Sequence, residues 1–246
     1  MSNYVLIHGS SQGGWIWKPT AKLLTSRGHE VYCPTLDGCG ERASAIRSGI
    51  TVTTQAKEIS DFLFYQDLND VILVATSTGG LVLCKVAEIS RDRVQKVVFV
   101  DALAPQPGQR VDEIVKLDTN MNQIRTDLTK GPSKEDLEQR LFKDLEEDLK
   151  QWAIKRVTMH PIEASDAPGE LDRFWEQTWD ATVVRCTKSV NPSGTHQKNR
   201  LSPSVTLLLC FFSIATKNHV EILPFLQFSY ASLLEKSLHN DQLQVL

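Results

Sequence analysis

The sequence lacks a large excess of charge of one sign and any long hydrophobic run. Its 246 residues include 27 basic and 30 acidic side chains, for a net charge of −3. A basic surface that would bind nucleic acid or an anionic membrane is therefore not expected. The longest apolar stretch, Val205–Ile214, has about ten residues, roughly half of a bilayer span. Because the first residues also lack the basic start of a signal peptide, we expect a cytoplasmic protein without a membrane anchor.

Cysteine pairs and cofactor motifs are also scarce. The five cysteines are dispersed and form no CxxC pair, which argues against a zinc site or a disulfide framework; they are Cys33, Cys39, Cys84, Cys186 and Cys210. We expect them to be free thiols. The chain has no Walker A motif, dinucleotide-binding fingerprint or metal-ligand cluster, so we predict no cofactor and no metal.

What the sequence does have is an alternation of short apolar runs and helical patterns. Near-continuous apolar runs are typical of parallel strands covered on both faces; they are Tyr4–His8, Glu30–Cys33, Val71–Ala75, Lys96–Asp101, Ala181–Cys186 and Val205–Phe212. Helical patterns lie between them at Trp17–Arg27, Gln55–Tyr65 and Ser77–Ser90. This order predicts the α/β class, with a doubly wound, mostly parallel sheet.

One charged segment interrupts the alternation. Residues 104–180 carry helical patterns and no strand signals, including a capped helix start at Pro132-Ser133 that is expected to run to about Val157. We predict that residues 1–103 and 181–246 form the core and that residues 104–180 form a helical cap. The alternative is that this segment has only a structural role and does not act as a lid.

The segment Val71-Ile-Leu-Val-Ala-Thr-Ser-Thr-Gly-Gly80 has the spacing of a nucleophile elbow. In that turn a strained serine joins a buried strand to a helix, and small residues two positions away let the strand and helix approach. Ala75 stands where glycine is usual and is still small. Ser77 is therefore the nucleophile candidate, and an ordinary turn with Ser77 as helix cap is the alternative.

Three other segments accompany this turn: Leu6-Ile-His8-Gly9-Ser10, Gly13-Gly14-Trp15-Ile-Trp17 and Pro34-Thr-Leu-Asp-Gly-Cys-Gly40. Together they resemble the α/β-hydrolases, and within them the small esterase, methylesterase and hydroxynitrile-lyase branch. The resemblance implies that the backbone N–H groups of Ser10 and Thr78 form an oxyanion hole. Lyase members carry threonine where this chain has Gly9, and this difference favours hydrolysis.

The resemblance also implies a catalytic histidine in the loop after the last strand. His219 fits, because it follows the run at 205–212 and precedes an expected C-terminal helix. The remaining histidines suit the role less well by their place in the chain; they are His8, His29, His160, His196 and His239.

The acid of the triad is less well defined. The resemblance implies an acid after the strand that follows the insertion, and here that segment, Cys186–Pro192, has no carboxylate. Asp101 ends the strand that follows the nucleophile strand and is our candidate. The alternatives are a structural Asp101 that binds loop amides, and a Ser–His dyad in which Asn191 or Ser189 orients the histidine.

Aromatic residues flank the expected oxyanion loop and recur in the insertion. Trp15, Trp17, Trp152 and Trp175 are the candidates for a hydrophobic substrate pocket, and packing within the cap is the alternative. We predict a serine hydrolase that cleaves small hydrophobic carboxylic or carbamic esters through an acyl-enzyme on Ser77. The alternatives are a ligand-binding or inactive relative and a hydroxynitrile lyase. The expected partner is the substrate, without nucleic acid or membrane, and a homodimer is an open alternative to a monomer.

Overall fold

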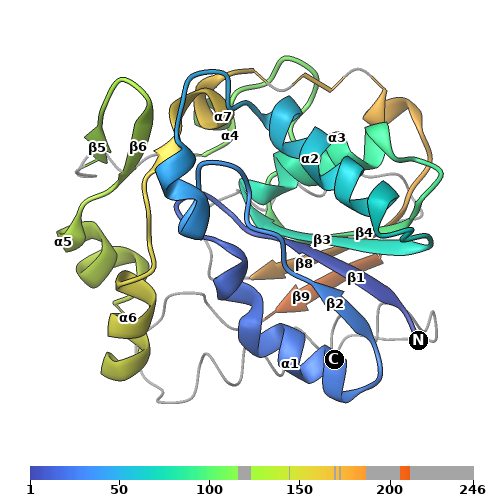
Figure 1. Cartoon of the computed structure of the whole chain (residues 1–246), viewed down its shortest axis with the longest axis horizontal. Helices are drawn as coiled ribbons and strands as arrows, with labels where there is room; N and C mark the ends of the chain where they lie inside the picture. The colour runs from blue at the N-terminus through green and yellow to red at the C-terminus, as the bar shows by residue number, and fades with distance from the viewer. Residues whose placement is uncertain (116–122, 144, 169, 172, 187–205, 211–246) are drawn as a thin grey trace.

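A parallel sheet forms the centre of the molecule (Figure 1). The computed structural model describes residues 1–115, 123–143, 145–168, 170–171, 173–186 and 206–210. Within these residues the large sheet has the strand order β2-β1-β3-β4-β8-β9, and every neighbouring pair is parallel. The strands are β1 (Asn3–Ile7), β2 (Glu30–Tyr32), β3 (Val71–Ser77), β4 (Val94–Ala102), β8 (Asp180–Cys186) and β9 (Thr206–Cys210). All six predicted strands are therefore confirmed, and the ends of the first five differ from the prediction by at most two residues. Residues 205, 211 and 212 of the last predicted run lie outside the described residues.

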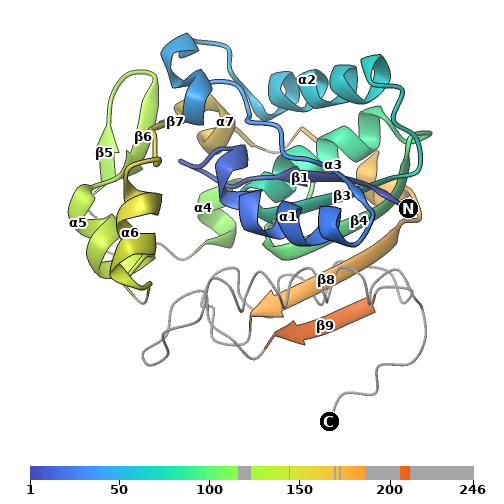
Figure 2. The ribbon, with the colours of Figure 1, turned by 60° about the horizontal axis from the view of Figure 1, so that its bottom comes forward.

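Helices cover both faces of this sheet, as the apolar runs predict. They are α1 (Lys18–Ser26), α2 (Val52–Tyr65) and α3 (Gly79–Ile89). Successive residues of β1 alternate between two apolar clusters: Val5 and Ile7 pack with α2 and α3, whereas Tyr4 and Leu6 pack with α1. Figure 2 shows α1 and α2 on different sides of the strands. The doubly wound α/β class is confirmed.

The insertion has helices, as predicted, namely α4 (Val111–Ile114), α5 (Lys134–Asp136), α6 (Glu147–Ile154) and α7 (Ile162–Asp166). It also has a small antiparallel sheet that the sequence does not indicate, formed by β5 (Gln123–Arg125), β6 (Thr129–Pro132) and β7 (His160–Pro161). The part of the insertion that holds β5, β6, α5 and α6 lies beside one end of the large sheet in both views (Figures 1 and 2).

The predicted single helix from 132 to about 157 is wrong. A π turn at Leu137–Leu141 follows α5, the chain leaves helical geometry at Phe142, and α6 begins only at Glu147. The first turn of α6 holds Glu147 and Asp148. Acidic side chains stabilise a helix start and destabilise a helix end, so this acidic segment favours a new helix over a continued one.

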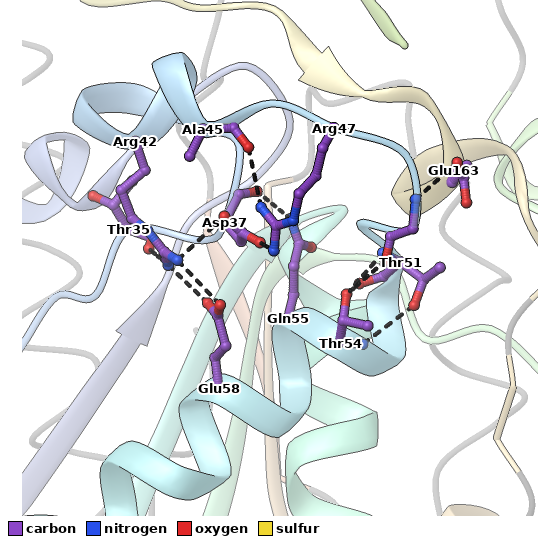
Figure 3. A network of polar contacts seen from close by, with 11 residues as sticks. Thr35, Asp37, Arg42, Ala45, Arg47, Thr51, Thr54, Gln55, Glu58 and Glu163 are labelled. Carbon is purple, nitrogen blue, oxygen red and sulfur yellow. Dashed lines mark hydrogen bonds and ion pairs between the residues drawn. The ribbon is translucent and has the colours of Figure 1, made fainter.

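The loop between β2 and α2 is held by an ionic network (Figure 3). Asp37 is buried, and its two carboxylate oxygens accept hydrogen bonds from Arg42 at 3.2 Å and Arg47 at 2.7 Å. Arg42 also binds Glu58 of α2, with contacts of 2.7 and 3.1 Å. Glu163 of α7 accepts from the backbone N–H of Gly49 at 3.0 Å. These bonds tie the loop to α2 and to α7 of the insertion. The division of the chain into a core and a helical cap over residues 104–180 stays a prediction.

The described residues contain neither a membrane-spanning helix nor a cluster of metal-binding side chains. None of the helices there is both long and apolar enough to cross a membrane. In the same residues, no three side chains of histidine, cysteine, aspartate or glutamate gather where they could hold a metal ion. The cytoplasmic location and the absence of a metal stay predictions.

Candidate active site

The sheet topology places two loops together at one point. The chain passes from β1 to β2 on one side and then crosses to β3 on the other side of β1. In parallel α/β sheets such a switch point opens a crevice at the carboxyl ends of the strands. Because Ile7 pairs with Ala75, the loop that follows β1 lies against the end of β3. This is where the sequence places the Ser77 turn and the His8-Gly9-Ser10 loop.

Ser77 occupies a strained and accessible position. Its φ of +51° lies in the left-handed region that non-glycine residues seldom adopt, and its side chain is exposed. The turn is tight because a Cβ on Gly80 would lie 1.9 Å from the Leu103 carbonyl oxygen, and one on Gly79 would lie 2.5 Å from the His8 oxygen. The two glycines thus let α3 start directly behind Ser77, where its N-terminus favours negative charge.

The loop after β1 is in direct contact with Ser77. A Cβ on Gly9 would lie 2.8 Å from Ser77 Cβ and 3.2 Å from its Oγ. The Gly9 backbone N–H donates to Gln12 Oε1 at 3.1 Å, and its carbonyl oxygen lies 2.8 Å from His8 Nδ1. Both polar groups of Gly9 are therefore held while its Cα packs against the serine. The Gln12 contact was not anticipated, since a single glutamine carries no recognisable pattern.

His8 orients the peptide that precedes Ser10. Its Nε2 accepts the Leu36 backbone N–H at 3.0 Å, so the ring proton is on Nδ1 and is donated to the Gly9 oxygen. Burial lowers the pKa of His8 to about 4, which keeps the ring neutral. In a trans peptide the C=O and N–H point in opposite directions. The Ser10 N–H therefore points away from the His8 ring.

Ser10 and Thr78 meet through their side chains. Ser10 Oγ lies 2.9 Å from Thr78 Oγ1, although the residues are 68 positions apart. Thr78 directly follows Ser77 and precedes α3. Ser10 and Thr78, the two residues predicted to supply oxyanion N–H groups, are therefore neighbours next to Ser77. Their role as oxyanion donors stays a prediction.

Asp101 lies at the same edge of the sheet as Ser77. It is buried, with 5% of its surface exposed, and has a φ of +47°. The next residue, Ala102, pairs with Ser77, and the Leu103 N–H donates to the Ser77 carbonyl oxygen at 2.8 Å. A second strained turn therefore ends β4 beside the first. Its role as the acid stays a prediction, and Ser189 and Asn191 lie outside the described residues.

The three histidines within the described residues have other surroundings. His8 has both ring nitrogens bonded to the backbone, and His29 packs edge-on against Tyr4 at the opposite end of the sheet. His160 Nδ1 lies 3.4 Å from Cys39 Sγ in a buried pair. Burial lowers the pKa of His160 to about 3 and raises that of Cys39 to about 12, so this pair is neutral rather than an ion-paired nucleophile and base. His219, His196 and His239 lie outside the described residues.

The predicted pocket tryptophans have different environments. Trp15 packs edge-to-face against Trp152 of α6, with ring centroids 5.2 Å apart, and the Arg156 guanidinium lies 4.6 Å from the Trp152 ring. Trp17 is buried with the apolar residues between α1 and the sheet. Trp175 donates from Nε1 to the Pro105 carbonyl oxygen at 2.8 Å. Trp15 and Trp152 thus join the β1 loop to the cap, and all four substrate contacts stay predictions.

Comparison with known proteins agrees with this geometry. The model of the alpha/beta hydrolase family matches residues 4–234, so the chain belongs to that family. The Carbendazim hydrolyzing esterase of Nocardioides sp. (strain SG-4G) is 37% identical over 108 residues, which are 44% of this chain and 45% of that protein. Methylesterase 17 of Arabidopsis thaliana is 32% identical over 115 residues, which are 46% of this chain and 42% of that protein. The chain spans about half the length of the curated relatives it matches.

Solved structures share the fold over almost the whole chain. An extracellular α/β-hydrolase from a Paenibacillus species superposes with a TM-score of 0.76, covering 96% of this chain and 99% of that one at 22% identity. The predicted resemblance to α/β-hydrolases, and to the branch with small esterases, methylesterases and hydroxynitrile lyases, is confirmed.

Proposed function

We propose that this protein is a serine esterase that cleaves small hydrophobic esters through an acyl-enzyme on Ser77. The observation that carries the proposal is the Ser77 turn. Ser77 is exposed at the carboxyl edge of the sheet, its φ is +51°, and the N-terminus of α3 starts directly behind it. A hydroxyl held in this way can approach a carbonyl carbon, and negative charge that develops beside it is stabilised.

The proposed reaction has two steps. Ser77 Oγ attacks the ester carbonyl carbon while His219 takes its proton, and the Ser10 and Thr78 N–H groups bind the oxyanion. The carbon–oxygen bond to the alcohol then breaks, and His219 returns the proton to the leaving oxygen. Water, deprotonated by His219, attacks the acyl-Ser77 carbonyl and releases the acid and the free serine.

His219 is proposed as the base because it follows the last predicted strand in the chain, and the three described histidines suit the role poorly. His8, His29 and His160 each lie in surroundings that exclude proton transfer from Ser77, through bonded ring nitrogens, distance along the sheet or burial. Asp101 is proposed as the acid, since it ends the strand adjacent to the nucleophile strand at the same edge. An acid buried in this position would stabilise the imidazolium form of the base.

The proposed substrates are uncharged esters, either carboxylic or carbamic. Two relatives are named as a carbendazim-hydrolysing esterase and a methylesterase, and both names describe ester cleavage. The edge-to-face contact of Trp15 and Trp152 supports an apolar wall beside the β1 loop. Gly9 stands where the lyases carry threonine, and this backbone leaves no room for that threonine, because a Cβ on Gly9 would lie 2.8 Å from Ser77 Cβ.

Turnover of p-nitrophenyl acetate tests the proposal. We expect wild-type protein to release p-nitrophenol and the Ser77→Ala variant to lose at least about 10⁴-fold in kcat, since the acyl-enzyme cannot form. His219→Ala should lose a similar factor and Asp101→Asn a smaller one. Ser26→Ala, which removes an exposed hydroxyl from α1, is the matched control and should retain wild-type turnover. Turnover in Ser77→Ala equal to that of the control would exclude Ser77 as the nucleophile. No turnover in wild-type protein would favour a ligand-binding or inactive relative.

A further inference from the structure

The hydrogen bond between the Ser10 and Thr78 hydroxyls joins the two sides of the candidate site. Ser10 belongs to the loop after β1, and Thr78 follows the nucleophile candidate at the end of β3. Their oxygen atoms are 2.9 Å apart, which is a normal length for a bond between hydroxyls. We refer to this contact as the hydroxyl bridge.

Thr78 does not use its hydroxyl as a threonine before a helix usually does. It occupies the N-cap position of α3, where a threonine side chain commonly accepts a backbone N–H from the first turn. Its backbone is already helical, with φ −66° and ψ −16°, and its side chain makes no capping bond. By contrast, Thr51 at the start of α2 accepts the Thr54 N–H at 3.2 Å. The Thr78 hydroxyl is therefore directed away from helix capping and toward Ser10.

The bridge joins two segments that are each held by local contacts. Gly9 packs on Ser77 so closely that no side chain fits, and both of its backbone polar groups are bonded. These contacts fix the loop up to the Gly9–Ser10 peptide. On the other side, the Ser77 turn is fixed by the close approach of Gly79 and Gly80 to the backbone. The remaining freedom is the distance and rotation between Ser10 and Thr78, and the bridge spans that gap.

We propose that the hydroxyl bridge positions the two oxyanion donors, so that Ser10 and Thr78 contribute to catalysis through their side chains as well as their backbones. This inference rests on the proposed function. The Ser10 and Thr78 N–H groups belong to separate segments, and a bond between the side chains of the same two residues sets the separation of those donors. Oxyanion stabilisation depends on donors that need no rearrangement as charge develops. The two side chains act through the backbone and are positioning groups.

Removal of the bridge should therefore lower kcat and leave KM nearly unchanged. Ser10→Ala and Thr78→Val each delete one hydroxyl, and Thr78→Val keeps the branched shape of threonine. Complete loss of one oxyanion donor costs about 10²- to 10³-fold in kcat, and small misplacements cost less. We expect about a 10- to 100-fold loss in either variant for p-nitrophenyl acetate. Thr78→Ser retains the hydroxyl and should restore most of the lost kcat.

The double variant tells whether the two hydroxyls act together through the bridge or contribute to kcat independently. Because either substitution already breaks the bridge, Ser10→Ala/Thr78→Val should be no slower than the slower single variant. The affinity for a trifluoromethyl ketone, which forms a tetrahedral adduct, should fall in parallel with kcat. The matched control is Thr129→Val, which breaks a hydroxyl–hydroxyl bond of 2.8 Å with Thr126 in the cap and should leave kcat unchanged.

The outcomes distinguish this inference from the proposed function. If wild-type turnover is absent or persists in Ser77→Ala, the proposed function fails and this inference falls with it. If turnover depends on Ser77 and the single variants stay within about twofold of wild type, only the bridge proposal is overturned. Losses in the double variant that equal the product of the single losses, or losses confined to KM, overturn it as well. Thermal unfolding midpoints close to that of wild type show that each variant is folded.

Discussion

Acidification from pH 6.5 to pH 5 should destabilise the folded protein because two buried histidines must stay neutral. Burial lowers the pKa of His8 to about 4 and that of His160 to about 3, from an ordinary value of 6.5. In the unfolded chain both rings gain a proton near pH 6.5, whereas in the folded chain they do not. The unfolded state therefore binds more protons in this window, and stability falls as the pH falls.

The size of the effect follows from the two pKa values. At pH 5 an unfolded histidine is almost fully protonated, while both folded rings remain largely neutral. Each ring then lowers the free energy of unfolding by about 2 kcal/mol relative to pH 8, and together they lower it by about 4 kcal/mol. A typical domain has only about 5–15 kcal/mol in total. The two histidines thus account for a large share of acid sensitivity.

Carboxylates contribute in a different pH range. Burial works against ionisation of Glu88 and Asp166, but hydrogen bonds and neighbouring cations lower the pKa of each below its ordinary value of 4.5 or 3.8. Their stabilising contribution is lost only as the pH falls below about 5. The interval between pH 6.5 and pH 5 therefore reports mainly on the histidines.

Urea unfolding followed by tryptophan fluorescence measures this dependence. In wild-type protein the free energy of unfolding should fall by about 1 to 1.4 kcal/mol per pH unit per histidine between pH 6.5 and pH 5. His160→Gln removes one of the two titrating rings and should halve the slope, with the same dependence on urea concentration. A free energy of unfolding that is constant over this interval, or a slope that His160→Gln leaves unchanged, would show that the buried histidines do not control stability in this pH range.

Three further predictions concern local packing and reactivity. In a urea titration, Gly80→Ala should lower the free energy of unfolding by about 3 kcal/mol or more, because its Cβ would lie 1.9 Å from a backbone oxygen. The control Gly28→Ala, at φ +86° with open space around it, should lower it by only about 1 kcal/mol. Asp37→Asn should lower the free energy of unfolding by about 1–2 kcal/mol, since two partly exposed arginines lose their buried carboxylate. An unchanged thermal unfolding midpoint would contradict this. Cys39 should resist iodoacetamide at pH 8 until urea is added, because burial raises the pKa of its thiol to about 12, and rapid alkylation of folded protein would disprove it.

The extent to which the sequence predicts this structure depends on how local each signal is. The core strands are local signals, since a run such as Val71–Ala75 needs burial on both faces wherever it pairs. The cap strands are not: β6 contains lysine, glycine and proline, and its extended form comes from pairing with β5 and β7. The start of α2 at Val52, before the predicted Gln55, depends on a capping box of Thr51 and Thr54 that overrides β-branched residues.

The candidate site also combines local features that the sequence predicts with long-range contacts that it does not. The spacing around Ser77 is contained in ten consecutive residues, so the turn could be anticipated from the sequence. The contact of Gly9 with Ser77 and the bridge between Ser10 and Thr78 join segments 68 residues apart and emerge only when β1 and β3 are paired. The burial of Trp17 beneath α1 is also a tertiary effect, because an aromatic residue near a glycine-rich loop has the same sequence signal in a core and in a pocket.

Covalent labelling of Ser77 is the most direct test of the central claim. Folded protein would be treated with a fluorophosphonate, digested and analysed by peptide mass spectrometry, beside Ser77→Ala and urea-unfolded samples. We expect one phosphonylated site per folded chain, at Ser77, and no labelling of the variant or of unfolded protein. Folded protein that remains unlabelled at Ser77, or a variant that is labelled as fast as wild type, would contradict it.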